Sequence, residues 1–85
     1  MSNATEILIV EDDIPFADDL AAVLGAQEYT VTVAPDVPAG RIALRESEPA
    51  LCLVDIMMPG PSGRIFCREV AEQSDCPVIM MSSLS

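Results

Sequence analysis

Residues 53–63 read LVDIMMPGPSG and join the end of an apolar run to a loop with two prolines and two glycines. The run begins at Leu51, and short apolar runs bounded by Pro and Gly are typical of buried strands in parallel sheets. Asp55 therefore stands at the rim of a strand. The prolines beyond it stiffen the backbone, while the glycines permit unusual turns or close approach. The plain alternative is a tight crossover, because these are ordinary turn residues.

Strand and helix patterns alternate on both sides of this stretch. The expected strands are Glu6–Val10, Tyr29–Ala34, Leu51–Val54 and Pro77–Met81. The expected helices run from Ile14 to a stop at Gly25, from a cap at Asp36 to about Glu46, and from a cap at Ser62 to about Gln73. Short connections and right-handed crossovers predict an α/β fold, a doubly wound parallel sheet with helices on both faces.

Each expected helix has an apolar face that would pack on the sheet. The residues on these faces are Ile14, Ala17, Leu20, Ala21 and Leu24 in the first, Ala39, Ile42 and Ala43 in the second, and Phe66, Val70 and Ile65 in the third.

Composition narrows the functional classes. The chain has 85 residues and a net charge of −10, and all four cations are arginines. Without a basic patch, this segment is not expected to bind nucleic acid. Three cysteines in no ligand spacing are expected to pack as small hydrophobes in a reducing compartment. No apolar run approaches the roughly 20 residues of a membrane span, and residues 1–5 are expected to form a flexible leader without signal-peptide features.

Polar side chains gather where the expected strands end. Parallel strands end at one edge of a sheet, and ligands bind at that edge. The residues that meet there are Glu11, Asp12 and Asp13 after the first strand, Asp55 after the third, and Ser82 and Ser83 after the fourth. Asp13 is better explained as a helix cap. Carboxylate oxygens with no histidine in the chain favour Mg²⁺, or Mn²⁺, over zinc.

Three segments carry a family resemblance: ILIVEDD, LVDIMMPGPSG and PVIMMSS, in this order. Together they resemble the receiver domain of bacterial two-component response regulators, and they cover residues 6–83. The resemblance implies a flavodoxin-like fold with strand order 2-1-3-4-5. It also implies a cytoplasmic signalling switch rather than a turnover enzyme.

The resemblance assigns roles to individual residues. Asp55 corresponds to the phosphoacceptor, which takes a phosphoryl group from a histidine kinase or phosphotransfer protein. Asp12 corresponds to a direct Mg²⁺ ligand, Glu11 to a ligand through water, and the backbone carbonyl of Met57 to a further ligand. In the same comparison, Ser82 engages the phosphoryl group on activation, and Ser83 keeps access to the site open. An output domain or downstream protein would read the switch.

The sequence also departs from the family pattern. Residues 6–85 correspond to a receiver domain truncated after the fourth strand, without the fourth helix, fifth strand and fifth helix. The family's lysine has no counterpart, because the chain contains no lysine. Phosphotransfer is therefore expected to be impaired, on the order of a hundredfold or more. The fourth strand would be an unprotected apolar edge, so we expect a homodimer, a swapped oligomer or aggregation.

Two other functions stay open at this point. One is an interaction or dimerisation module that does not use phosphate. The other is a metal-dependent phosphohydrolase, but such enzymes carry a second acid two residues past the nucleophile, where this chain has Met57.

Overall fold

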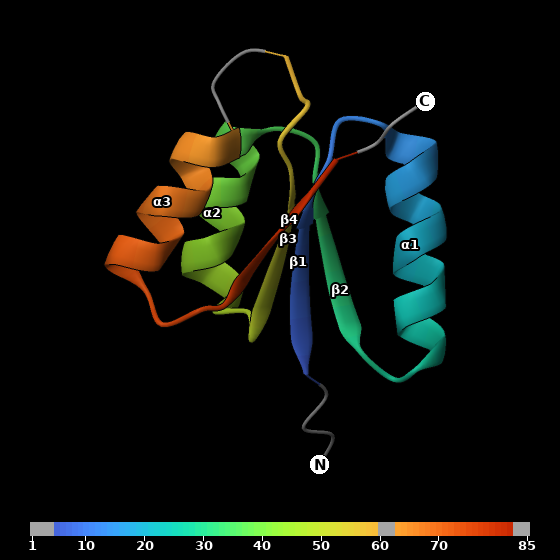
Figure 1. Cartoon of the computed structure of the whole chain (residues 1–85). Helices are drawn as coiled ribbons and strands as arrows, with labels where there is room; N and C mark the ends of the chain where they lie inside the picture. Colours follow the sequence, from blue (N-terminus) through green and yellow to red (C-terminus); the bar gives the residue numbers. More distant parts are fainter. Residues whose placement is uncertain (1–4, 60–62, 83–85) are drawn as a thin grey trace.

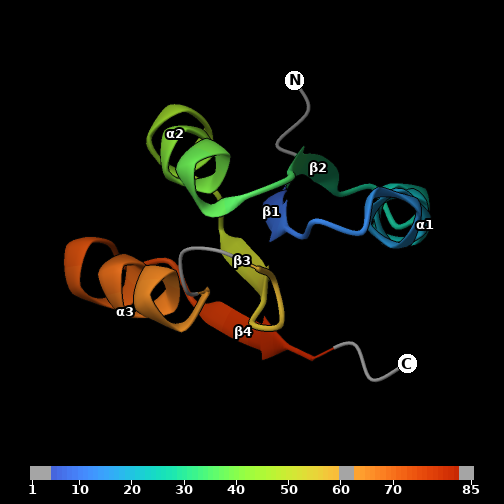
Figure 2. The same ribbon diagram turned by 90° about the horizontal axis from the view of Figure 1, so that it is seen from above.

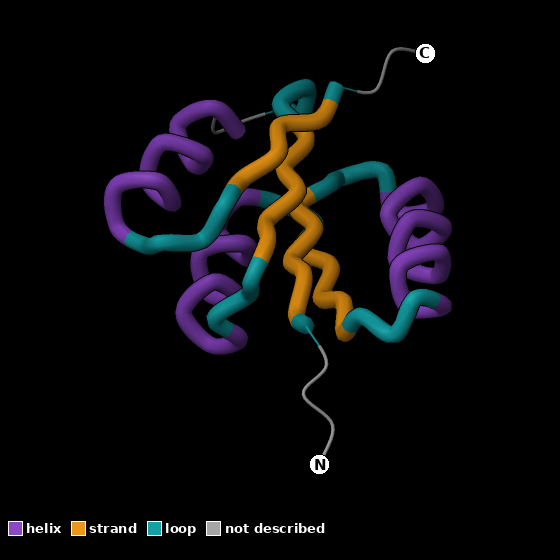
Figure 3. The backbone as a smooth tube through the Cα atoms, turned by 60° about the horizontal axis from the view of Figure 1, so that its bottom comes forward, coloured by secondary structure: helices purple, strands orange, loops and turns teal. Residues whose placement is uncertain are grey.

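The computed structural model describes residues 5–59 and 63–82. Four strands, β1 (Glu6–Val10), β2 (Thr30–Ala34), β3 (Leu51–Asp55) and β4 (Val78–Met81), alternate with three helices. The helices are α1 (Ile14–Ala26), α2 (Val37–Ser47) and α3 (Gly63–Gln73). In Figure 3 each connection between successive strands passes through a helix. All paired strands are parallel, in the order β2-β1-β3-β4. The predicted doubly wound α/β architecture is confirmed.

The helices form two layers around the sheet. Helix α1 covers one face, and α2 and α3 cover the other (Figures 1 and 2). Two clusters of buried side chains follow from this arrangement. The larger lies under α2 and α3 and contains Leu8, Val54 and Phe66, whereas the smaller lies under α1 and contains Ile9 and Ala17.

Caps at the predicted residues start two of the helices. The carboxylate of Asp13 accepts a hydrogen bond from the Phe16 N–H at 3.2 Å, and that of Asp36 accepts one from the Ala39 N–H at 2.9 Å. Each carboxylate thereby satisfies an N–H that the first helical turn leaves unpaired. The predicted cap at Ser62 lies outside the described residues.

The predicted end of the first helix is wrong. Gly25 does not stop α1, which continues to Ala26. The chain leaves the helix when the N–H groups of Gln27 and Glu28 bond back to Leu24 and Gly25, at 3.0 and 2.9 Å. The left-handed backbone conformation that favours glycine falls on Glu28, with φ of 70°, three residues later than expected.

Three predicted core side chains are exposed instead. Ile14, Ile42 and Ile65 are 41%, 49% and 57% exposed. Each lies on a helix flank that no other described element covers. The true inner surface of α2 includes Gly40, where an added Cβ would lie 3.0 Å from Val10 Cγ2. A residue without a side chain lets α2 approach the sheet there.

The three cysteines pack as predicted. All are free, Cys52 and Cys67 are buried, and Cys76 is partly buried. Burial raises the pKa of the Cys52 thiol to about 12, so this side chain is chemically quiet. None of the helices in the described part of the chain is long and apolar enough to cross a membrane.

Candidate functional site: a carboxylate cluster at the sheet edge

The register of the sheet brings two carboxylates together. Val10 and Val54 are partners in neighbouring strands β1 and β3. Glu11 follows Val10 and Asp55 follows Val54, so both lie at the carboxyl ends of adjacent strands. Asp12 comes next along the chain. Residues more than 40 positions apart therefore meet because parallel strands end on the same side.

Three of the predicted acids form a compact cluster. Glu11, Asp12 and Asp55 each offer a carboxylate oxygen, and these atoms all lie within 4.8 Å of one another. Glu11 is 1% exposed and Asp55 is 2% exposed, whereas Asp12 is exposed to solvent. Two of the three charges are thus withdrawn from water beside a third, which is costly without a compensating cation.

Hydrogen bonds satisfy only part of this cluster. The Asp13 N–H donates to Glu11 Oε2 at 3.1 Å, and the Met57 N–H donates to Asp55 Oδ1 at 2.8 Å. Glu11 Oε1 is buried and has no hydrogen-bond partner. A buried oxygen without a partner normally has a specific reason, such as an ion that binds there.

The electrostatics of Glu11 reflect this environment. Burial, and after it the neighbouring Asp55 and Asp12 side chains, together raise the pKa of its carboxyl from the ordinary 4.5 to about 7, against the bond from the Asp13 N–H, which lowers it. The cluster therefore favours either a proton on Glu11 or a cation between the carboxylates. The ligand atoms that Glu11, Asp12 and Asp55 offer are all carboxylate oxygens, and this donor chemistry fits Mg²⁺ or Mn²⁺.

Close approach of α3 holds Asp55 in place. An added Cβ on Gly63 would lie 2.7 Å from the Asp55 carbonyl oxygen and 3.3 Å from Ile56 Cα. The close approach expected of the loop glycines is therefore present at Gly63, the first residue of α3. The remaining loop residues 60–62 lie outside the described part of the chain.

The other predicted residues differ in how they relate to the cluster. Asp13 caps α1 and is not one of the three clustered acids, as expected. The Met57 side chain is 60% exposed, so this residue faces the cluster through its backbone. Ser82 directly follows β4 and is exposed. Ser83 lies outside the described residues.

A contribution from the end of β2 was not predicted. A hollow of about 140 Å³ adjoins the cluster, and its walls come from three loops. Asp12, Asp36 and Met58 are among its lining residues. The rule that parallel strands end at one edge applies to β2 as well, and would have identified the loop that holds Asp36.

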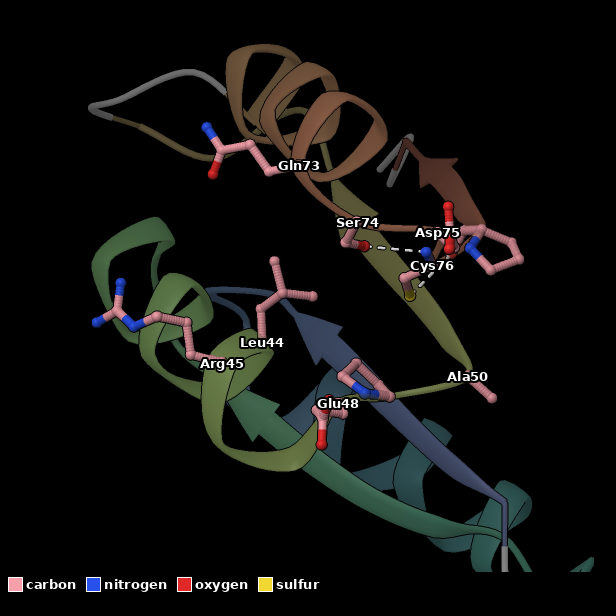
Figure 4. A pocket seen from close by; sticks show the side chains of 10 residues that line it. Leu44, Arg45, Glu48, Ala50, Gln73, Ser74, Asp75 and Cys76 are labelled. Atoms are coloured by element: carbon pink, nitrogen blue, oxygen red, sulfur yellow. Dashed lines mark hydrogen bonds between the residues drawn. The ribbon is translucent and has the colours of Figure 1, made fainter.

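A larger hollow lies at the opposite edge of the sheet. Its volume is about 620 Å³, and it lies between the C-terminal ends of α2 and α3 (Figure 4). Leu44, Arg45 and Cys76 are among its lining residues. It contains none of the clustered acids, so chemistry rather than size identifies the candidate site.

Comparisons with known proteins show the family and the fold of this chain. A family model described as "Response regulator receiver domain" matches residues 7–85. Transcriptional regulatory protein CseB of Streptomyces avermitilis is 36% identical over 83 residues, which are 98% of this chain and 35% of that protein. Sensory transduction protein RegX3 of Mycobacterium tuberculosis is 37% identical over 79 residues, with coverage of 93% and 35%. The chain thus spans about a third of the length of these relatives.

Solved structures show the same fold. The BeF3-activated receiver domain of Klebsiella pneumoniae RstA superposes with a TM-score of 0.88 at 33% identity, covering 95% of this chain and 69% of that one. Thermotoga maritima TrrA, solved in complex with Mg²⁺ and BeF, gives a TM-score of 0.86 at 23% identity, with coverage of 95% and 71%. At that identity the second likeness concerns the fold alone. The flavodoxin-like prediction is confirmed.

Proposed function

The chain belongs to the response regulator receiver domain family of two-component systems, and from this we propose that Asp55 is its phosphoacceptor. The observation that carries the proposal is the cluster of Glu11, Asp12 and Asp55, whose carboxylate oxygens lie within 4.8 Å of one another. Asp55 ends a central strand and is held by hydrogen bonding from Met57, as a positioned nucleophile requires.

The proposed reaction is transfer of one phosphoryl group from the phosphohistidine of a histidine kinase or phosphotransfer protein. An Asp55 carboxylate oxygen forms a bond to phosphorus while the phosphorus–nitrogen bond breaks. The imidazole nitrogen that leaves takes a proton from solvent, and Asp55 becomes an acyl phosphate. Because Asp55 Oδ1 already accepts the Met57 N–H, we assign Oδ2 as the attacking atom.

The residues that would hold Mg²⁺, or Mn²⁺, are Asp12 and Asp55 directly, Glu11 through water, and the Met57 backbone carbonyl. The partnerless Glu11 Oε1 and the all-oxygen cluster support this assignment. When bound, the cation supplies positive charge against the phosphoryl oxygens. Glu11 and Asp12 contribute by fixing that charge beside Asp55. With no lysine in the chain, we expect slower transfer than such a residue would allow.

Ser82 is the proposed switch residue. It stands where β4 ends, at the same edge of the sheet as Asp55, and its hydroxyl can donate to a phosphoryl oxygen. A charged group that Ser82 engages would shift an existing equilibrium between two surfaces. Ser83 is proposed to keep the site accessible.

Partners follow from the family. We propose a bacterial cytoplasmic setting, a histidine kinase or phosphotransfer protein upstream, and an output domain or downstream protein as the reader. Among the relatives, CseB is a transcriptional regulatory protein and RegX3 a sensory transduction protein. This segment, with its net charge of −10, is not proposed to contact nucleic acid itself.

Intact-protein mass after incubation with acetyl phosphate and Mg²⁺ tests the proposal. We expect one phosphoryl group on the wild type, none on Asp55→Asn, and an unchanged result for Asp19→Asn, which removes an exposed carboxylate of α1. Binding of beryllofluoride, followed by ¹⁹F NMR, provides a readout that does not depend on the transfer rate. Failure of the wild type in both measurements would refute the phosphoacceptor role and leave the phosphate-independent interaction module.

A further inference from the structure

The hollow between the C-terminal ends of α2 and α3 has no part in the chemistry proposed for Asp55. Its volume of about 620 Å³ falls in the range of small-molecule sites, roughly 300–1,000 Å³. Helix α2 contacts β1 and β2, whereas α3 contacts β3 and β4, so the space between the two helices lies over the central strands β1 and β3. A further strand beyond β4 and its crossover helix would lie past α3, away from α2. The hollow therefore does not depend on them.

The lining of the hollow combines an apolar floor with a polar rim. Leu44 and Cys76 are half-buried and pack against the larger core cluster, and Pro49 is buried beside them. The Leu44 side chain projects from α2 into the space between the two helices (Figure 4). Glu48 and Asp75 also line the hollow, and both are exposed. This combination is typical of sites for a ligand with an apolar body and a polar group.

The charge around the hollow favours a cation. Both helices end beside it, and the carbonyl end of a helix carries partial negative charge. Glu48 and Asp75 add two carboxylates. Arg45 is the only cation among the described residues that line the hollow, and its guanidinium points away from the other labelled side chains (Figure 4). Within residues 5–59 and 63–82, Arg45 forms an ion pair with neither carboxylate.

The backbone of Glu48 supports a role for its side chain. Glu48 follows α2 in the left-handed conformation, with φ of 46° and ψ of 62°. Glycine is favoured in this conformation at a helix end, because a Cβ crowds the following carbonyl oxygen. Residues held in such conformations are often found at functional sites. Since the turn alone would favour glycine, an interaction that the hollow offers explains the glutamate more simply.

We propose that this hollow binds a small organic cation, an ammonium group on an apolar body. Glu48 and Asp75 are placed to face the ammonium, which exchanges water for carboxylate oxygens. Leu44, Pro49 and Cys76 are placed to contact the apolar body. Because both carboxylates are exposed, solvent and salt screen their attraction for the cation. We therefore expect a dissociation constant of about 1 mM near neutral pH, and weaker binding at high salt.

Titration of the 85-residue chain with benzylamine, followed by NMR of the backbone amides, tests the proposal. Benzylamine is cationic near neutral pH, whereas benzyl alcohol is neutral and benzoate is anionic on the same ring. The three probes thus separate charge from apolar burial. We expect benzylamine to shift the amides of Leu44, Ala50 and Cys76, and to bind at least about fivefold more tightly than benzyl alcohol. Benzoate is expected not to bind.

Two variants of Glu48 show whether its carboxylate contributes. Glu48→Gln removes the charge and keeps the size of the side chain, while Glu48→Gly removes the side chain in a conformation that suits glycine. Glu46→Gln is the matched control, because it removes an equal charge from the last turn of α2 and does not line the hollow. We expect benzylamine to bind at least about threefold more weakly to both Glu48 variants, and equally well to Glu46→Gln and the wild type.

Benzyl alcohol that binds as tightly as benzylamine would overturn the proposal, as would Glu48 variants that bind benzylamine like the wild type. The proposal also fails if benzylamine shifts none of the three amides of the hollow. Shifts confined to the Met57 amide would place the cation at the carboxylate cluster and refute binding in the hollow. Each of these results leaves the proposed role of Asp55 untouched, because that residue lies at the opposite edge of the sheet.

Discussion

Stability without metal is expected to fall as the pH rises, because of Glu11. Its folded-state pKa of about 7 lies above the ordinary 4.5, so folding favours the protonated carboxyl. This contribution is fully present below about pH 4.5 and is lost as the pH rises through about 7. The perturbation that isolates it is Glu11→Gln, which keeps the size of the side chain and removes its titration.

The magnitude follows from the two pKa values. At about 1.4 kcal/mol per pKa unit, their difference corresponds to a full contribution of about 3 kcal/mol to the free energy of unfolding. Between about pH 5.5 and about pH 8 the linkage relation gives about 2 kcal/mol of lost stability. The low exposure of Glu11, 1%, means that solvent screens little of this effect.

Urea unfolding at several pH values, in the presence of a metal chelator, measures how the free energy of unfolding depends on pH. We expect the wild type to lose about 2 kcal/mol more than Glu11→Gln over that pH range. Glu72→Gln is the matched control, since it also removes one carboxylate, here an exposed one of α3, and makes the chain less negative by one charge. Parallel profiles for the wild type and Glu11→Gln would show that Glu11 titrates normally, and that the cluster is not electrostatically strained.

Three further results are expected. Mg²⁺ should raise the urea midpoint of unfolding more at about pH 8 than at about pH 5.5, because protons compete with the cation for the carboxylates. Asp12→Asn should abolish this increase. An equal increase in the wild type and in Asp12→Asn would exclude the cluster as the metal site. Gly63→Ala should cost about 1–3 kcal/mol in urea unfolding and slow phosphorylation, because its Cβ would lie 2.7 Å from the Asp55 carbonyl oxygen. Glu69 of α3 accepts two hydrogen bonds from Arg41 of α2, at 2.6 and 3.0 Å. Glu69→Gln should lower the melting temperature, because it weakens this link between the two helices. An unchanged melting temperature would show that the pair is only a surface contact.

The sequence was sufficient for the order of elements and for the clustered acids. Both depend on regularities that survive without tertiary detail. Short apolar runs mark buried parallel strands, and the ends of such strands meet at one edge. Glu11 and Asp55 could therefore be brought together before any contact was known. The burial of Glu11 and its partnerless Oε1 could not be predicted, because they depend on how the following loops fold over the strand end.

The helix faces were less predictable for a related reason. A periodic pattern tells which residues share a face, but burial also requires an element that covers it. Ile42 and Ile65 share faces with buried residues and yet remain largely exposed. Gly40 lies at the centre of a helix contact and offers no hydrophobic signal, since its role is to let backbone and side chains approach. Patterns of hydrophobicity overlook contacts of this type.

The carboxylate cluster has opposite effects on stability and on function. Glu11 and Asp55 are buried against each other, and Glu11 Oε1 has no partner, although a protein selected for stability alone would pair or remove such groups. The same repulsion makes the edge responsive, because a cation or a proton relieves it while a phosphoryl group changes its charge. An Asp55→Asn variant keeps the acceptor for the Met57 N–H and removes one of the repelling charges. The change that abolishes the proposed phosphorylation therefore also relieves the strain on Glu11. For this reason we interpret the electrostatic cost of the cluster as the requirement of a switch rather than as a defect of the fold.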